Sequence, residues 1–182
     1  MFKHKLFATA AMTIFVLALT TQLTYAADGP SDAQIVGIVL AADQIDIDYG
    51  TIALSKSQNQ QVREFAERMV TDHSAVQKSV IGLAAKLNVT AAASPTSTGL
   101  KSGAVDITAK LNSLQGAEFD KFYIDNEVSY HETVTNAVAT VLIPSAQNPQ
   151  LKSALEGAEP LFLKHLEHAR SIQSGTAMPM SH

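Results

Sequence analysis

The chain has 182 residues, 46% of them apolar and 16% charged, with a formal net charge of −4 and no cysteine. That length suits one domain with its own hydrophobic core. A mildly acidic chain without a basic run argues against nucleic-acid binding, because neutralising phosphates dominates that affinity. The absence of cysteine excludes disulfides, thiolate metal sites, cysteine nucleophiles and a lipidated N-terminal cysteine.

Residues 1–26 have the order of a secretory signal peptide. Lys3 and Lys5 precede an apolar run over residues 6–19, and Thr24 and Ala26 stand at the −3 and −1 positions of a signal-peptidase site. The run is shorter than the roughly 20 residues that a spanning helix needs, and an uncleaved anchor is the alternative. We expect a mature protein that begins at Ala27, has no transmembrane segment and is exported to a bacterial periplasm.

Two helices with a short connection open the mature chain. Ser31 and Gln34 form a capping box ahead of a first helix over residues 33–55. The second helix begins near Asn59 and continues to Leu87, with a continuous apolar stripe made of Val62, Ala66, Met69, His73, Val76, Val80, Leu83 and Leu87. So short a connection makes the two helices antiparallel neighbours.

The helical pattern stops after Asn88. Residues 91–99 are small, polar and interrupted by proline, which predicts a connection, with a short helix over residues 105–114. A third long helix is expected over residues 117–143, where Pro144 stops it. Its inward row includes Phe119, Tyr123, Glu127, Tyr130 or His131, Val134, Val138 and Val141.

A last helix begins at Asn148 and Pro149, because an N-cap residue followed by proline is a typical helix start. It continues to about Gln173, and Pro160 inside it predicts a kink. Residues 175–182 form a flexible tail, which leaves residues 27–174 as the folded body.

The predicted fold is all-α. Two antiparallel pairs joined by a long link indicate a four-helix bundle with one crossover between its second and third helices. A plain up-down-up-down bundle with a loose loop is the alternative. The crossover is favoured because a structureless link of this length is uncommon unless it spans the bundle.

Several segments carry a family resemblance. The run from Phe65 to His73, which contains Met-Val-Thr-Asp-His, follows Tyr49-Gly-Thr-Ile-Ala-Leu54; residues 116–120, Tyr123, His131 and residues 160–165 complete the pattern. Together they resemble an exported bacterial family of unknown function with a ferritin-like fold, whose members are often labelled outer-membrane proteins. The resemblance implies a ferritin-like bundle, with association to the outer membrane as one outcome and no established activity. That family commonly has a glutamate in the first helix, where this chain has Asp46 or Asp48.

Three histidines fall at one height of the bundle. At 1.5 Å per residue, His73, His131, His165 and Asp46 all lie within roughly one helical turn of each other. Each histidine lies on a different helix, at an inward or nearly inward position. Three imidazoles and a carboxylate suit Zn²⁺, Cu²⁺ or Fe²⁺. The sequence therefore predicts one transition-metal ion bound by His73, His131 and His165, with Asp46 or Glu127 completing the site.

Asp72, Tyr49 and Tyr130 are candidates for orienting these ligands. In the alternative interpretation, each histidine is a structural core residue hydrogen-bonded to Asp72, Glu127, Tyr49 or Tyr130. The protein is then a structural or interaction module of the cell envelope. A core that loosens when the histidines become charged below neutral pH is a third interpretation.

The dinuclear iron pattern of many ferritin-like enzymes is missing, since no Glu-x-x-His motif occurs. A degenerate redox enzyme remains an alternative, but the sequence favours a protein that is not a conventional enzyme. His168 is expected to face solvent. Met178, Met180 and His182 in the tail are soft or borderline metal ligands that we attribute to chance.

Overall fold

The computed structural model describes residues 29–175, and every regular element within them is helical. The expected signal peptide, its cleavage site and residues 176–182 of the tail lie outside the described residues. No helix in the described part combines the length and apolarity that crossing a bilayer requires. The prediction of an all-α fold is confirmed for these residues.

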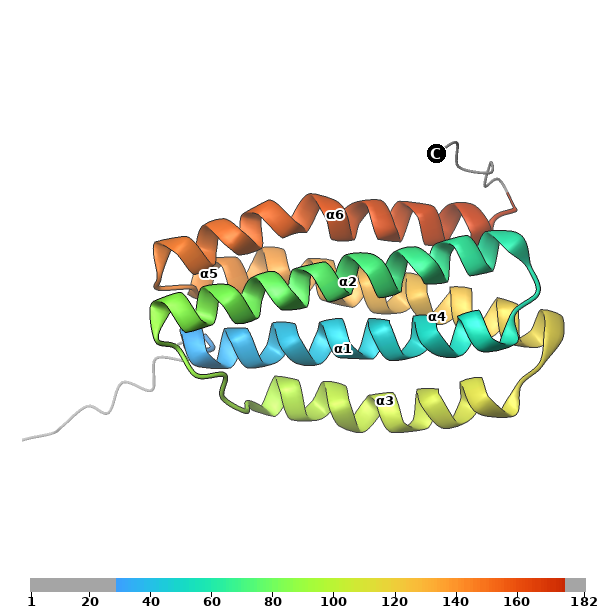
Figure 1. Cartoon of the computed structure of the whole chain (residues 1–182), viewed down its shortest axis with the longest axis horizontal. Helices are drawn as coiled ribbons and strands as arrows, with labels where there is room; N and C mark the ends of the chain where they lie inside the picture. Colours follow the sequence, from blue (N-terminus) through green and yellow to red (C-terminus); the bar gives the residue numbers. More distant parts are fainter. Residues whose placement is uncertain (1–28, 176–182) are drawn as a thin grey trace, which may run out of the picture.

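The first two helices begin and end close to their predicted limits. α1 spans Asp32–Lys56, and the capping box of Ser31 and Gln34 forms as expected. α2 spans Gln60–Leu87, and the Asn59 side chain accepts hydrogen bonds from the backbone of its first turn. The connection of three residues turns the chain back, so the two helices run antiparallel along their length (Figure 1).

The predicted connection is mostly a helix, which corrects the expectation of a short helix near its end. α3 spans Pro95–Ser113 and begins at Ser94, whose hydroxyl accepts a hydrogen bond from the Ser97 backbone. Its C-terminal carbonyls receive a cation, because the Lys56 amine donates to Leu111 O at 2.9 Å and Asn112 O at 2.6 Å. These contacts stabilise a helix whose own residues are poor helix formers.

α3 runs along the outside of α1 over most of the length of α1 (Figure 1). The chain therefore crosses from one end to the other before the next long helix begins. As a result α2 and α4 (Gly116–Ala137) point in the same direction, while α1 and α6 (Pro149–Gln173) point in the opposite one.

Pro144 does not stop the helix that precedes it. α4 passes into a π-helix, η1 (Val138–Leu142), and then into the short α5 (Ile143–Ser145), which contains the proline. The wider π turn places the next inward residue after Val138 at Leu142, and Val141, expected inside, is 42% exposed. α6 begins at the predicted Asn148 cap and stays helical across Pro160, bending along its length (Figure 1).

Two glycines in α1 are required by close contacts. A Cβ at Gly37 would lie 2.1 Å from the Ala92 carbonyl oxygen, because the chain after α2 crosses α1 there. A Cβ at Gly50 would lie 2.9 Å from the Ala66 carbonyl oxygen of α2. Glycine weakens an isolated helix, but in α1 it allows neighbouring backbone to approach.

The hydrophobic core consists of two separate clusters. One includes Phe65, Phe119 and Tyr123, and the other includes Ile35, Leu151 and Phe162. α1, α2, α4 and α6 each contribute apolar residues to both clusters, with buried polar residues near the middle, where one cluster gives way to the other. This polar layer contains Asp43, Asp46, His73, Glu127, His131 and His165.

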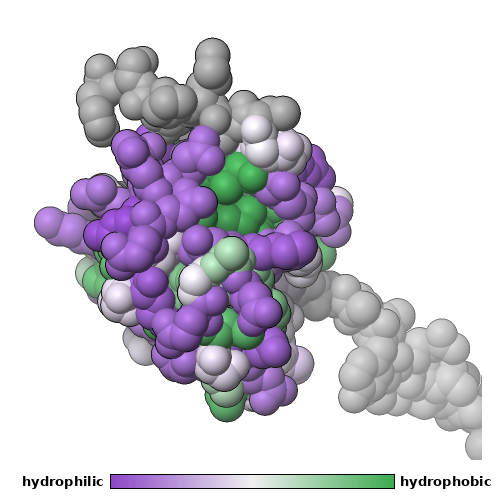
Figure 2. Space-filling view, turned by 90° about the vertical axis from the view of Figure 1, so that its right-hand side faces the viewer, coloured by the Kyte–Doolittle hydropathy of each residue, from purple (hydrophilic) through white to green (hydrophobic). Residues whose placement is uncertain are grey.

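One end of the molecule has a largely polar surface. Figure 2 views the end of the molecule that carries the α1–α2 and α3–α4 connections, where hydrophilic side chains surround a small apolar area. The fold therefore leaves one unusual feature inside, the layer of ionisable side chains at mid-height.

Candidate metal centre

Three helices bring the predicted histidines together. His73 of α2, His131 of α4 and His165 of α6 are each at most 2% exposed. Their ring centroids are 5.7 Å apart for His73 and His131, 5.2 Å for His73 and His165, and 5.5 Å for His131 and His165. One ligand atom from each ring lies within 4.8 Å of the other two. The three imidazoles thus surround a common point.

Each ring is held by one of its nitrogens. His73 Nδ1 lies 2.9 Å from Asp43 Oδ1, and His165 Nε2 lies 2.8 Å from Asp72 Oδ2. His131 Nδ1 lies 3.0 Å from the backbone carbonyl oxygen of Glu127. These acceptors require a hydrogen on the nitrogen that they contact, so in a neutral ring the other nitrogen carries a lone pair.

The second nitrogen of each ring has no hydrogen-bond partner among the described residues. These atoms are His73 Nε2, His131 Nε2 and His165 Nδ1. Buried polar atoms are normally paired, so three unpaired nitrogens around one point need an explanation. A metal-binding histidine has this same pattern, in which one nitrogen is oriented by an acceptor and the other binds the ion.

Two buried carboxylates reach the same region. Asp46 of α1 is 1% exposed and Glu127 of α4 is fully buried, and one ligand atom from each lies within 4.8 Å of one on His131. Asp46 Oδ2 is 3.5 Å from His73 Nε2, and Glu127 Oε2 is 3.5 Å from His131 Nδ1. All four oxygens of these carboxylates lack a hydrogen-bond partner within the described residues.

Burial determines the protonation of this cluster. It lowers the pKa of His131 to about 3, with a further contribution from the nearby His73 and His165, and that of His165 to about 4. Burial also lowers the pKa of His73, but Asp46 and Asp43 outweigh it and the net shift is upward. At neutral pH His131 and His165 are therefore neutral imidazoles, the form that binds metal ions.

The carboxylates shift the other way. Burial raises the pKa of Glu127 to about 8, and it raises the pKa of Asp46 well above its ordinary value, to which the charge of Glu127 adds. The ionised forms are costly here because no buried residue in the described part is a lysine or arginine. The site is an electron-rich pocket that favours a cation or bound protons.

The predicted supporting residues take different positions. Asp72 Oδ2 lies 2.8 Å from His165 Nε2, and the Asp72 side chain is the more accessible partner, at 27% exposed. Tyr130 donates its hydroxyl to the Ala42 carbonyl oxygen at 3.2 Å, and not to a histidine as the alternative interpretation allowed. Tyr49 packs edge-on against the Tyr130 ring, at 6.4 Å between centroids.

Sequence reasoning missed Asp43. It lies one helical turn before Asp46 on the same helix, and that spacing was the available signal. The apolar pattern of α1 hides it, because most positions in the middle of this helix are buried and α1 contacts α2, α3 and α4.

His168 was expected to face solvent and is instead half-buried. Its ring packs edge-on against Phe65 at 5.3 Å, and its Nδ1 has no hydrogen-bond partner among the described residues. It lies one turn beyond His165 on α6 and is not among the residues that converge at the centre.

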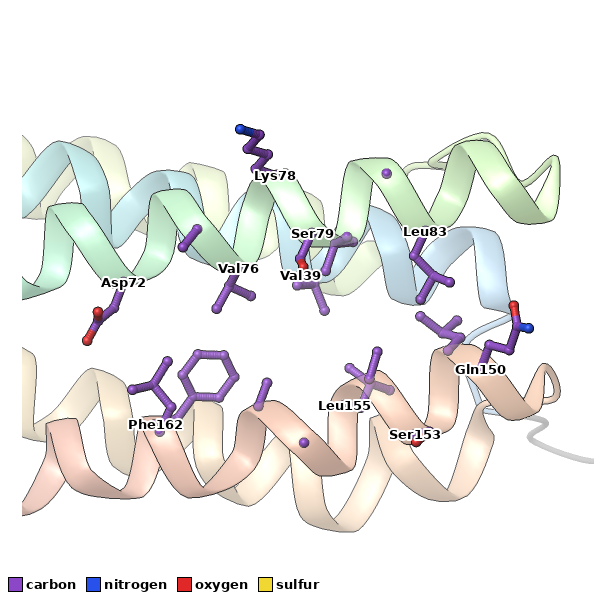
Figure 3. A pocket seen from close by; sticks show the side chains of 18 of the residues that line it. Val39, Asp72, Val76, Lys78, Ser79, Leu83, Gln150, Ser153, Leu155 and Phe162 are labelled. Carbon is purple, nitrogen blue, oxygen red and sulfur yellow. The ribbon is translucent and has the colours of Figure 1, made fainter.

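A groove of about 940 Å³ between α2 and α6 leads to the site (Figure 3). Small residues open it, among them Ala75, Gly82, Ala154 and Gly157. Asp72 and Phe162 face each other from the two helices at one end of it. Phe162 also stacks on the His73 ring, with 5.4 Å between centroids and 5° between planes. The groove therefore ends on residues in direct contact with two of the histidines.

The comparisons with known proteins identify one family, whose function is unknown. No curated protein and no solved structure matches the chain. One family model matches residues 18–172, which include every helix described above except the last residue of α6. The chain therefore belongs to the family described as a domain of unknown function, DUF4142.

Proposed function

We propose that this protein is an exported, ferritin-like four-helix bundle that binds a transition-metal ion through His73, His131 and His165. A carboxylate oxygen from Asp46 or Glu127 completes the set of ligands. The observation that carries the proposal is the convergence of three unpaired ring nitrogens, each on an imidazole already oriented by an acceptor.

The dimensions of the cluster are compatible with an ion. Metal–nitrogen bonds of about 2.0–2.1 Å in a tetrahedral site separate the ligand nitrogens by about 3.4 Å. The ligand atoms of the three histidines lie within 4.8 Å of one another. Side-chain movements of about 1 Å therefore suffice to close the site, a change that a buried rotamer can accommodate without moving a helix.

The donor set selects a class of ion. Neutral imidazole suits zinc, copper and iron, whereas Mg²⁺ and Ca²⁺ prefer sites made only of oxygen. Three nitrogens and one oxygen match Zn²⁺, Cu²⁺ and Fe²⁺. The chain's own contribution is to hold the imidazoles in fixed tautomers and to exclude water from the ion.

Two further features support the wider proposal. The leader-like order of residues 1–26 supports export. Four long helices around a polar layer at mid-height, with a crossover carried by α3, support a ferritin-like arrangement.

A structural role is the second candidate, and the same three hydrogen bonds favour it. Asp43, Asp72 and the Glu127 carbonyl each satisfy one nitrogen of a histidine without any ion. In that case a histidine variant changes stability only, and the protein has no metal affinity to lose.

Metal titration of the purified protein separates the two candidates. Protein stripped with a chelator is titrated by calorimetry with Zn²⁺, Cu²⁺ and, without oxygen, Fe²⁺, and the same preparation is analysed for elements before stripping. We expect saturable binding, and we expect His131→Gln to weaken it at least 100-fold, because the variant removes one nitrogen donor.

His168→Gln is the matched control, since His168 is half-buried on α6, packs against Phe65 and is not among the residues that converge at the centre. It should bind metal as the wild type does. No binding of any of the three ions by the wild-type protein would overturn the proposal, as would equal affinity in wild type and His131→Gln.

A further inference from the structure

We infer that the groove between α2 and α6 binds one free long-chain fatty acid, with its alkyl chain along the groove and its carboxylate beside Lys86. The inference goes beyond the metal site of the proposed function and does not require an ion. It rests on the open space between the two helices, on the apolar residues beneath that space, and on the position of the few charges that border it.

The groove exists because α2 and α6 lie apart there. α2 packs much more extensively against α1 than against α6. Small residues recur on both sides of the groove, with Ala75, Ser79 and Gly82 on α2 and Ala154 and Gly157 on α6. Residues three or four positions apart share one side of a helix, so these form two continuous walls. A Cβ at Gly82 or Gly157 would meet no heavy atom within 4 Å, and both glycines therefore border open space.

The floor of the groove is apolar and only partly covered. Val76, Leu83 and Leu161 line it and are half-buried. Figure 3 shows Val76 and Leu83 of α2 directed toward α6. Ligand sites are typically concave spaces of about 300–1,000 Å³ with mostly apolar walls, and this groove of about 940 Å³ is within that range. An apolar chain gains free energy by covering these side chains from water.

The charges that border the groove are few and separated. α2 and α6 are antiparallel and Asp72 contacts His165, so Lys86, further along α2, lies at the height of Leu151 and at the end opposite Asp72. Lys78 lies between them, but its side chain points away from α6 (Figure 3). Among the described residues that line the groove, these three are the only charged ones. The ion pairs of the described residues do not include Lys86.

This pattern of charge selects the ligand. A complementary molecule is uncharged along its length and anionic at one end, which describes a fatty acid. Its carboxylate would lie beside Lys86 and Gln150, and the end of its chain would lie against Phe162. Asp72 repels a carboxylate and so disfavours the reverse orientation. The uncharged walls offer no partner to the charged side chains of a docked helix, from another protein or from a second copy of this chain.

The length of the groove predicts the length of the chain. Gln150 and Phe162 mark its two ends on α6, which are about 18 Å apart at about 1.5 Å per residue. An extended alkyl chain advances roughly 1.3 Å per carbon, because its carbon–carbon bonds are near 1.5 Å, so a chain of about 14 carbons fills the groove.

Calorimetric titration of the chelator-stripped protein with fatty acids, each below its micellar concentration, tests the inference. We expect one molecule bound per chain. Affinity should rise about fourfold per methylene from octanoate through dodecanoate to tetradecanoate and level off at hexadecanoate, whose chain exceeds the groove. Dodecyltrimethylammonium has the same alkyl chain as a twelve-carbon amphiphile of opposite charge, and it should bind about tenfold more weakly than dodecanoate because Lys86 repels it.

Two pairs of variants locate the ligand. Gly82→Leu fills the open space on α2 and should weaken tetradecanoate binding about 100-fold or more, because the chain loses most of its apolar contact. Gly103→Leu is its matched control, since Gly103 also borders open space but lies on α3. Lys86→Glu should reverse the preference between dodecanoate and dodecyltrimethylammonium. Lys164→Glu, an exposed change on α6 outside the groove, should leave that preference unchanged. Circular dichroism verifies that all four variants are folded.

Several results would overturn the inference. One is that no fatty acid binds, and another is an affinity that is independent of chain length or equal in Gly82→Leu and Gly103→Leu. A dimer in sedimentation analysis that Gly82→Leu dissociates would mean that a second copy occupies the groove. Binding to phosphatidylglycerol vesicles without binding of free dodecanoate or tetradecanoate would assign the groove to a membrane lipid instead of a free fatty acid.

Discussion

Asp72 provides a test of the proposed metal centre, because it contacts the proposed ligand His165 without lying among the unpaired donors. Its carboxylate accepts the hydrogen of His165 Nε2 at 2.8 Å, which directs Nδ1 of that ring toward the other two histidines. Removal of such an acceptor typically lowers metal affinity 10- to 100-fold, or about 1.4–2.8 kcal/mol of binding free energy. Asp72→Asn keeps an acceptor oxygen and loses the charge, so we expect about the lower value. Asp72→Ala loses both and should approach the upper one.

The effect on folding should be smaller than the effect on binding. The Asp72 side chain is 27% exposed, so its interaction with His165 is partly screened by solvent, and we expect about 1 kcal/mol or less of lost stability in the metal-free protein. Calorimetric Zn²⁺ titration and urea unfolding of the stripped protein measure the two quantities. Glu67→Gln, an exposed carboxylate change on the same helix, should alter neither. Wild-type affinity in Asp72→Ala, alongside lost affinity in His165→Gln, would refute the orienting role.

Three further predictions follow from the buried layer and the packing. The free energy of unfolding of the metal-free protein should fall by about 2 kcal/mol between pH 6.5 and 8. The reason is that burial raises the pKa of Glu127 to about 8, so in this range the folded protein keeps a proton that the unfolded chain has lost. Between pH 6.5 and 4 the histidines act in the opposite sense, because the unfolded chain takes up protons that the buried His131 and His165 do not bind. Glu127→Gln removes the opposing contribution of Glu127, so this variant should lose more free energy of unfolding than the wild type below pH 6.5 and less above it, as measured by urea titrations across pH. Phe162→Ala should lower the free energy of unfolding by about 3–5 kcal/mol, because it leaves a cavity where the Phe162 ring stacks on His73. The same urea unfolding curves measure this loss, and a value below 1 kcal/mol would contradict the packing described. Gly37→Ala should destabilise the protein by more than 1 kcal/mol, because the added Cβ would meet the Ala92 carbonyl oxygen. Gly103→Ala, in open space on α3, should instead raise the thermal stability. Equal effects of the two substitutions would be inconsistent with the contact at Gly37.

The sequence predicted the positions of the three histidines because the rise of a helix is constant. Once the capping residues Ser31, Asn59 and Asn148 located the helix starts, the height of each side chain followed by counting. The same reasoning could not find Asp43, since α1 is buried on nearly all sides and an apolar stripe no longer marks one inward face.

The misjudged elements have physical causes of a different kind. α3 contains glycine, serine and threonine, and local propensity argued against a helix; contacts with α1 and the Lys56 cap overrode it. Val141 was misplaced because the π-helix before Pro144 changes the angular spacing of the side chains. Which nitrogen of each histidine stays unpaired depends on acceptors from neighbouring helices, and a single helix pattern contains no information about them.

The groove between α2 and α6 would govern the exchange kinetics of a bound ion. The three histidines are sealed from solvent, and Asp72, where the groove ends, is the partly open carboxylate beside them. A hydrated cation would be captured there first and would lose its water in stages as it passes His165. Such an ion would leave through the same groove, so its residence time would depend on how readily α2 and α6 separate along their small residues.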